Sequence, residues 1–170
     1  REKKLLLGRD RYGIKPLYYS KQGDLFLFGS EQKAITSHPE FIKKLNKKSL
    51  LEYFTFQNIF TDQTLLEDIH ILKGGHWLSI DLVNNSFQTE MYWDYKFMEV
   101  NHSNDLREYT EELDRLFKQA VKRQLISDVE LGSYLSGGMD SGSISAIAAN
   151  NFQYLKSFTV GFDLSSASGL

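Results

Sequence analysis

The segment Ser136–Ser141, Ser-Gly-Gly-Met-Asp-Ser, combines residue types that can hold a phosphate group. Gly137 and Gly138 have no Cβ, so their backbone can adopt unusual φ values and approach a ligand closely. Ser136 and Ser141 add hydroxyl donors, and a helix beginning here would present unpaired N–H groups and a partial positive charge. Together these features indicate a seat for a phosphate or a pyrophosphate.

Asp140 would repel phosphate oxygens, because like charges about 4 Å apart cost about 4 kcal/mol at an effective dielectric constant of about 20. A divalent cation between them removes the conflict, and Mg²⁺ prefers one or two carboxylates together with substrate phosphates. We therefore expect Asp140 to bind the Mg²⁺ of a magnesium nucleotide. The alternative is that Asp140 caps the helix and the glycines only shape a strand-to-helix turn. The segment matches neither a Walker A loop nor the G-x-G-x-x-G fingerprint.

The elements around this segment must place it at the edge of a sheet. Residues 129–135 are predicted as a strand, the small-residue run at 144–149 as a helix, and residues 155–162 as the next strand. A strand, a crossover helix and a strand in this order predict a parallel α/β sheet.

A longer helix is predicted over residues 106–125, where the apolar period becomes helical. Its charged residues offer the i,i+4 pairs Glu111–Arg115 and Asp114–Lys118, worth about 0.2–0.5 kcal/mol each. The apolar stripe expected to be buried consists of Leu113, Leu116, Phe117, Ala120, Val121 and Leu125.

The N-terminal part of the chain is predicted as short strands. Residues 5–7 form an apolar run suited to a buried strand. Residues 17–19 and 25–28 are aromatic-rich runs that flank a Gly23-Asp24 turn signal, which predicts a β-hairpin.

A second hairpin is predicted further along. Residues 69–72 and 76–80 are joined by Gly74 and Gly75, a dipeptide typical of hairpin turns. Residues 87–93 are predicted as another strand.

Two helices are predicted between these hairpins. One begins near Ser30, which we expect to be its N-cap. The other covers residues 46–56, with Leu50, Leu51 and Phe54 as its apolar stripe.

Composition excludes several classes of function. The chain has 170 residues with 20 Lys and Arg against 22 Asp and Glu, so it lacks the basic excess typical of nucleic-acid binding. It has no cysteine, which excludes disulfides, zinc–thiolate sites and a cysteine nucleophile within it. No apolar run approaches the roughly 18 residues that a membrane span needs. Because the sequence does not begin with Met, we expect it to be a fragment.

Ser136–Ser141 resembles the PP-loop of ATP pyrophosphatases, which adenylate a substrate and release pyrophosphate. Residues 9–19 and 28–35 resemble the later part of the glutaminase domain of glutamine-dependent asparagine synthetases. Further resemblances follow in the same family order at residues 75–76, 92–94 and 157–162. The chain thus resembles an internal fragment of this family.

The resemblance implies an α+β part followed by an α/β part. Residues 1–100 would be the C-terminal part of an N-terminal-nucleophile glutaminase sandwich, a class II glutamine amidotransferase domain. Residues 101–170 would begin a parallel-sheet PP-loop ATP pyrophosphatase domain. The full-length enzyme would convert aspartate and Mg-ATP into β-aspartyl-AMP and pyrophosphate, and ammonia freed from glutamine would then give asparagine.

The resemblance also implies a set of site residues. The pyrophosphate end of ATP would be held by Ser136, Gly137, Gly138, Asp140 and Ser141, with Asp140 on Mg²⁺. Leu135, Val160 and Gly161 would contact the adenosine part. No glutaminase catalytic residue is expected here, because the family's cysteine is absent, and the isolated chain is expected to be inactive. We expect small-molecule substrates (aspartate, glutamine, ATP), no nucleic acid or membrane partner, a cytoplasmic location, and a homodimer as one allowed assembly.

Gly142 departs from the family pattern, which usually has Ser or Thr there. The departure is either tolerated variation or a sign of a paralogue with a different acceptor. Three alternatives to the asparagine synthetase also stay open, because the loop alone does not separate related enzymes. The chain could come from a paralogous amidotransferase, from a β-lactam-synthetase-like enzyme that adenylates a different carboxylate, or from a non-catalytic remnant.

Overall fold

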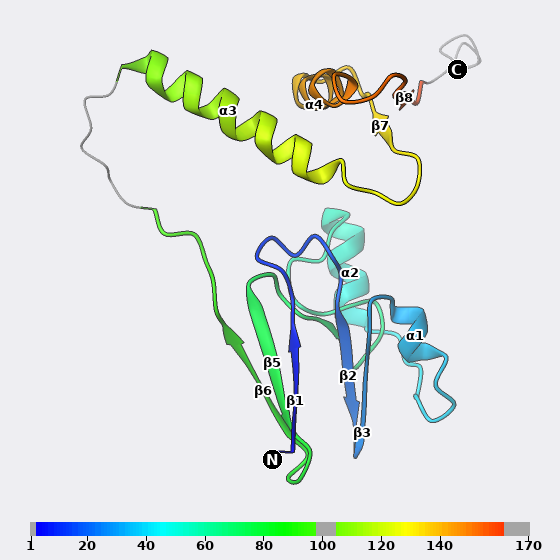
Figure 1. Cartoon of the computed structure of the whole chain (residues 1–170). Helices are drawn as coiled ribbons and strands as arrows, with labels where there is room; N and C mark the ends of the chain where they lie inside the picture. Colours follow the sequence, from blue (N-terminus) through cyan, green and yellow to red (C-terminus); the bar gives the residue numbers. More distant parts are fainter. Residues whose placement is uncertain (1–2, 98–104, 162–170) are drawn as a thin grey trace, which may run out of the picture. The chain divides into compact units, whose positions relative to one another are not determined.

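The structure is a computed structural model that describes residues 3–97 and 105–161. The described chain is mixed α/β and divides into two compact units, unit 1 (residues 3–97) and unit 2 (residues 105–161) (Figure 1). The domain boundary expected between residues 100 and 101 lies outside the described residues. The mixed composition of the fold agrees with the expectation, whereas the glutaminase sandwich and the pyrophosphatase architecture stay predictions.

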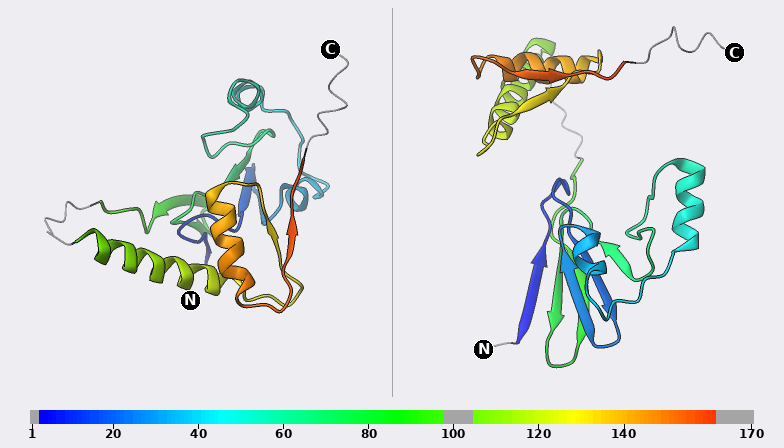
Figure 2. Two further views of the ribbon diagram at one scale, coloured as in Figure 1. Left: turned by 90° about the horizontal axis from the view of Figure 1, so that it is seen from above. Right: turned by 90° about the vertical axis from the view of Figure 1, so that its right-hand side faces the viewer.

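Unit 1 contains two three-stranded antiparallel sheets. The first has the order β1-β5-β6 and consists of β1 (Lys4–Gly8), β5 (His76–Asp81) and β6 (Ser86–Met91). The second has the order β3-β2-β4 and consists of β3 (Leu25–Gly29), β2 (Tyr18–Gln22) and β4 (Ile69–Ile71). Both sheets appear from two further directions in Figure 2.

The hairpin predicted around Gly23 and Asp24 is confirmed. β2 and β3 pair antiparallel, with Tyr19 opposite Phe28. Gly23 has a φ of +59°, a left-handed conformation that glycine adopts without steric cost.

The hairpin predicted around Gly74 and Gly75 is wrong. β4 pairs with β2 in one sheet, and β5 pairs with β1 in the other, so the two glycines carry the chain between sheets. A Cβ on Gly74 would lie 2.8 Å from the backbone nitrogen of Gly13, and a Cβ on Gly75 would overlap the carbonyl oxygen of Trp93. The glycines are therefore needed for close backbone approach, a role that the local sequence does not distinguish from a turn.

The core of unit 1 has two parts. One contains Leu7, Leu78 and Ile80 of the first sheet together with Tyr19 of the second, and so joins the two sheets. The other gathers Ile35, Phe41 and Ile69. Burying a Leu or Ile side chain contributes about 1.5–3 kcal/mol, so each of these residues stabilises the unit.

Helix α1 (Gln32–Thr36) begins one residue later than predicted. Its N-cap is Glu31 and has no side-chain hydrogen bond, so the prediction of Ser30 as the cap is wrong. Backbone N–H of Ala34 instead bonds to the Glu31 carbonyl in the first turn.

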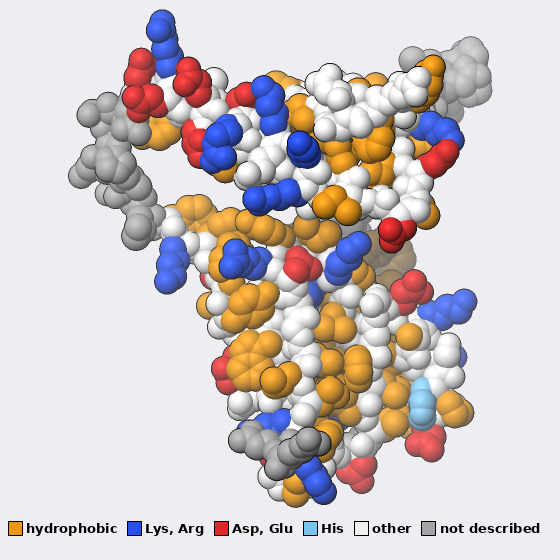
Figure 3. Space-filling view, in the orientation of Figure 1, with side chains coloured by type: hydrophobic (Ala, Val, Ile, Leu, Met, Phe, Trp, Pro, Cys, Tyr) orange, Lys and Arg blue, Asp and Glu red, His pale blue; other side chains and the backbone are white. Residues whose placement is uncertain are grey.

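Helix α2 (Lys47–Phe56) follows Asn46, whose side chain accepts a hydrogen bond from Ser49 N at 3.2 Å. The predicted apolar stripe is not a buried face, because Leu51 is 70% and Phe54 is 74% exposed. Ser49 is the buried residue of the helix. Figure 3 shows that hydrophobic side chains are also exposed elsewhere on the surface of the described chain.

Unit 2 contains α3 (Leu106–Gln124), β7 (Gly132–Tyr134), α4 (Met139–Ala149) and β8 (Lys156–Phe158). β7 and β8 pair in parallel, with Tyr134 opposite Phe158, which confirms the predicted parallel arrangement. Helix α4 lies against β7 and α3 (Figure 2). Both strands are shorter than predicted, and Phe162, the expected end of the second, lies outside the described residues.

Helix α3 agrees with its predicted range to within one residue, but its stripe is largely exposed. Val121 is buried, whereas Leu113 is 68% exposed. Lys118 pairs with Asp114 as expected, at 2.6 Å, but Arg115 pairs with Glu112 rather than Glu111. The i,i+3 partner lets the guanidinium fork meet both carboxylate oxygens, each at 2.6 Å. No helix within residues 3–97 or 105–161 is long and apolar enough to cross a membrane.

Candidate active site

The loop between β7 and α4 is the segment singled out for chemistry. Gly137 has a φ of +81°, and a Cβ there would meet no atom within 4 Å, so the loop is open to its surroundings. Gly138 is the N-cap of α4 and leaves the helix without a side-chain cap. The backbone of this loop is therefore accessible to a ligand.

The two loop serines hydrogen-bond to each other in this structure. The Ser141 hydroxyl donates to the carbonyl of Gly138 at 3.1 Å, which uses its single proton. Its lone pairs then accept from Ser136 N at 3.2 Å and from the Ser136 hydroxyl at 3.0 Å. These bonds place both hydroxyl oxygens beside the start of α4.

The first turn of α4 supplies the remaining donors. Within residues 105–161, the N–H groups of Met139, Asp140 and Ser141 have no hydrogen-bond partner, as expected for the first turn of a helix. The N–H of Gly142 is the first to bond back, to Gly138 O at 3.0 Å. Three free donors and the helix dipole make this end of α4 attractive to an anion.

Asp140 is exposed in the first turn of α4 and makes no hydrogen bond or ion pair in the described part of the chain. Its side chain does not cap the helix, so that part of the structural alternative is wrong. The glycines do shape the strand-to-helix turn, where Gly137 has a φ of +81°. The described residues also hold no group of three His, Cys, Asp or Glu side chains that could bind a metal by themselves. A lone carboxylate beside an anion seat fits Mg²⁺, because that ion takes its remaining ligands from substrate phosphates and water.

The strand side of the loop is fixed by β8. Leu135 N donates to Phe158 O at 2.9 Å, and the Thr159 hydroxyl donates to Leu135 O at 2.7 Å. Val160, 84% exposed, and Gly161 follow β8 at the same sheet edge, because parallel strands end on the same side.

The structure thus brings all eight predicted residues to one edge of the small sheet. Ser136, Gly138 and Ser141 are directly hydrogen-bonded to one another, whereas Asp140 is not, and neither Val160 nor Gly161 makes a hydrogen bond to the loop within residues 105–161. The hydroxyls of Thr159, Ser133 and Ser145 also form hydrogen bonds in this region, and none of the three was predicted as a site residue. Only their hydroxyl chemistry signals a role, and serine and threonine are too common for that signal to be specific.

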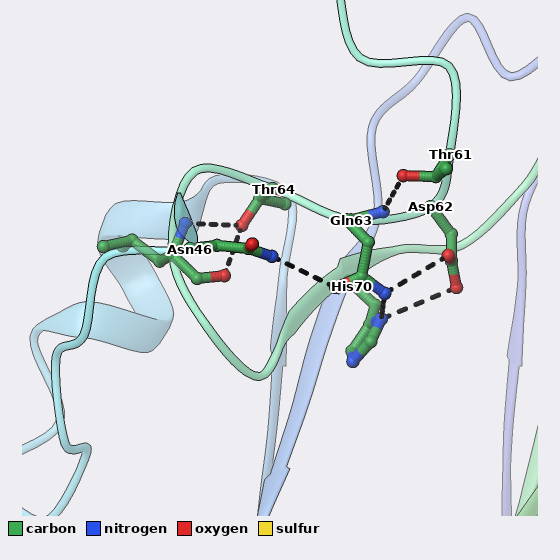
Figure 4. Close-up of polar contacts among 7 residues, drawn as sticks. Asn46, Thr61, Asp62, Gln63, Thr64 and His70 are labelled. Atoms are coloured by element: carbon green, nitrogen blue, oxygen red, sulfur yellow. Dashed lines mark hydrogen bonds and ion pairs between the residues drawn. The ribbon is translucent and has the colours of Figure 1, made fainter. Parts of the chain in front are cut away.

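A second polar cluster, in unit 1, was not predicted either (Figure 4). Gln63 Nε2 lies 3.2 Å from His70 Nδ1, and Asp62 Oδ2 lies 3.5 Å from the same nitrogen. Asn46, the cap of α2, donates to Gln63 at 3.3 Å. Since the cluster links the start of α2 to β4, its contacts serve the structure of unit 1.

Tyr19 stacks on the ring of His70, with 5.4 Å between ring centroids. Burial raises the pKa of the Tyr19 phenol, and the nearby Asp62 carboxylate raises it further. A small cavity of about 120 Å³ is lined by Tyr19 and Asp62, among other residues. Because Tyr19 is buried in the core of unit 1, we assign it a packing role.

Two families match the chain. Residues 1–93 match the family described as Glutamine amidotransferase domain, and residues 112–168 match the family described as Asparagine synthase. The chain belongs to the asparagine synthetase family. This agrees with the resemblance drawn from the sequence.

Several curated proteins are similar to most of the chain. Asparagine synthetase 3 (glutamine-hydrolyzing) of Bacillus subtilis (strain 168) is 37% identical over 150 residues, which cover 88% of this chain and 24% of that protein. Asparagine synthetase 2 of the same organism is 36% identical over 169 residues, covering 92% and 22%. Amidase chry2 of Gibberella zeae is 31% identical over 153 residues, covering 86% and 21%. The chain spans about a quarter of the length of these relatives.

Proposed function

We propose that this chain is part of a glutamine-hydrolysing asparagine synthetase, in which unit 2 begins the ATP site and unit 1 belongs to the glutaminase. The observation that supports this most directly is the open loop between β7 and α4. It combines three free N–H groups, two hydroxyls and an unpaired carboxylate at the edge where parallel strands end.

In the proposed reaction an oxygen of the aspartate side-chain carboxylate attacks the α-phosphorus of ATP. The bond from that phosphorus to the bridging oxygen breaks, and pyrophosphate leaves. Ammonia from glutamine then attacks the activated carbon, and AMP departs with the former carboxylate oxygen. Adenylation is required because a free carboxylate has no good leaving group.

The residues of unit 2 act on the departing pyrophosphate. The N–H groups of Met139, Asp140 and Ser141 would bind its oxygens where negative charge increases in the transition state. The hydroxyls of Ser136 and Ser141 would exchange their mutual bond for bonds to phosphate. Asp140 would hold Mg²⁺, which when bound neutralises charge on the pyrophosphate.

The intact protein tests this proposal through pyrophosphate release from Mg-ATP and aspartate. Asp140→Asn removes the charge at constant size and should lower the rate at least about 100-fold, as for loss of a group that stabilises a transition state. Asp128→Asn is the matched control, because Asp128 is also exposed and unpaired within residues 105–161. A normal rate for Asp140→Asn would contradict the role of Asp140, and a wild-type protein without pyrophosphate release would contradict the whole proposal.

A second candidate is a paralogous enzyme that adenylates another carboxylate. The similarity to amidase chry2 favours it, since that relative is named as an amidase and not as a synthetase. Pyrophosphate release measured with a panel of carboxylates separates the two, because only the first candidate requires aspartate to be the best substrate.

We also propose a cytoplasmic location, a homodimeric assembly and a lack of activity in the isolated chain. We place the enzyme in the cytoplasm because it would use ATP, and light scattering on the intact protein tests for a homodimer. The isolated 170-residue chain should not form asparagine from ammonia or glutamine. Detectable asparagine in that assay would contradict this expectation.

A further inference from the structure

Two serines outside the loop are linked by a short hydrogen bond. Ser133 on β7 and Ser145 on α4 have their hydroxyl oxygens 2.6 Å apart. The Ser145 hydroxyl also donates to the carbonyl of Ser141 at 2.7 Å, and a hydroxyl has one proton. The proton between the two serines must therefore come from Ser133. The bonds form a directed chain from Ser133 through Ser145 to Ser141.

This series of hydrogen bonds ends on Ser141, a residue of the proposed pyrophosphate seat. Ser141 contributes both its N–H and its hydroxyl to the seat, while its carbonyl receives the bond from Ser145. Ser133 and Ser145 are both half-buried, on the strand and helix that flank the loop. Ser143, on the same helix, makes no hydrogen bond through its side chain within residues 105–161.

The hydrogen bonds from Ser133 through Ser145 to Ser141 anchor the start of α4, where apolar packing is sparse. Ala148, near the end of the helix, is its buried residue, whereas Met139 in the first turn is 84% exposed. The strand side of the loop is already fixed by the bond from Thr159 to Leu135. Between these two anchors lie Gly137 and Gly138, which do not fix the backbone themselves.

We propose that Ser133 and Ser145 are positioning residues for the pyrophosphate seat. They hold the first turn of α4 at a fixed place beside β7, so that its N–H groups meet the departing pyrophosphate. Precise placement matters, since a displacement of about 1 Å can cost about 100-fold in rate. This inference rests on the proposed function, because it assigns the two residues to the same ATP site.

Steady-state kinetics of the intact protein test the proposal. Ser133→Ala and Ser145→Ala should each lower kcat/KM for ATP about tenfold, the scale of one lost hydrogen bond, with KM for aspartate unchanged. The kcat/KM of the double variant should be no lower than that of the less active single variant, because either substitution breaks the same series of hydrogen bonds. Ser145→Thr should retain activity, because a helical threonine hydroxyl also bonds to the carbonyl four residues earlier. Ser143→Ala is the control and should match the wild type.

The outcomes separate this inference from the proposed function. Wild-type pyrophosphate release with normal kinetics in both alanine variants would overturn the positioning role alone. Losses that multiply in the double variant would also overturn it, since the two serines would then act independently. A fall in thermal stability that accounts for the lost activity, without restoration by Ser145→Thr, would show a merely structural role. A wild-type protein that releases no pyrophosphate would overturn both proposals.

Discussion

The guanidinium of Arg9 donates a 2.5 Å hydrogen bond to the backbone carbonyl of Leu72, 63 residues away in the sequence. Its other nitrogens donate to the carbonyls of Lys15 at 2.8 Å and Gly13 at 2.5 Å. One side chain thus joins the segment after β1 to the segment after β4. Leu72 belongs to the hydrophobic core that both sheets share. Arg9 therefore ties the loop after β1 to that core.

Replacing Arg9 with lysine should destabilise unit 1. A lysine keeps the charge but cannot direct three donors in a planar fork, so we expect a loss of about 2 kcal/mol in the free energy of unfolding. Urea denaturation followed by tryptophan fluorescence measures it, since Trp77 and Trp93 both lie in unit 1. Arg11→Lys is the control, with an expected change below about 1 kcal/mol, and equal effects of the two substitutions would contradict the prediction.

The Asp10 carboxylate should make unit 1 sensitive to acid. The backbone N–H groups of Lys15 and Ile14, both at 3.0 Å, lower the pKa of Asp10, and that of Tyr12 adds to the effect. Since the folded pKa lies below the unfolded value of about 3.9, ionised Asp10 stabilises the fold above that pH. This stability is lost as the pH falls from about 4 through the lower folded pKa.

Asp10→Asn should therefore reduce the loss of stability on acidification below about pH 4. Denaturation midpoints measured against pH show the effect. Glu40→Gln is the comparison, because the Glu40 side chain is exposed and accepts no hydrogen bond within the described ranges. The same acid dependence in Asp10→Asn and the wild type would disprove the assignment.

Gly75 should tolerate no side chain. Its φ is +67°, and an added Cβ would overlap the Trp93 carbonyl oxygen, so Gly75→Ala should cost at least about 3 kcal/mol. Gly23 has a similar φ of +59° but no atom within 4 Å of the added Cβ, so Gly23→Ala should cost only about 1 kcal/mol. Thermal unfolding of the two variants isolates the steric part, and a smaller effect at Gly75 than at Gly23 would refute this explanation.

Gly137 and Gly142 should respond in opposite ways. Gly137→Ala puts a Cβ on a residue with a φ of +81°, which should distort the loop and lower pyrophosphate release at least about tenfold. Gly142 is helical with open space around it, so Gly142→Ala should stabilise α4 by about 1 kcal/mol. Activity and melting temperature measured together test both, and loss of release in Gly142→Ala would show that the helix position is also functional.

Elements that are determined by residues close together in the sequence could be predicted. The β2–β3 hairpin follows from the turn at Gly23, and the order β7, α4, β8 follows from a strand, a glycine-rich turn and a helix. The loop residues and Asp140 could be named because their chemistry is local. Contacts such as that from Arg9 to Leu72 could not, since no local pattern identifies a partner 63 residues away.

The errors have the same origin. Gly74 and Gly75 have the composition of a turn but are required by backbone that arrives from Gly13 and Trp93. Ser133 and Ser145 escaped notice because their pairing exists only once α4 lies on β7. Packing between residues that are far apart in the sequence determines these features, so periodicity and residue type alone cannot reveal them.

Strand β3 lies at an edge of its sheet, with β2 on its only paired side among the described residues. Its sequence, Leu-Phe-Leu-Phe-Gly, carries no charge and no proline. Edges of this kind template addition of strands from other molecules unless something covers them. Preparations of the free chain should therefore aggregate as concentration rises, and a lysine in place of Phe28, which is 48% exposed, should act as a gatekeeper against such assembly.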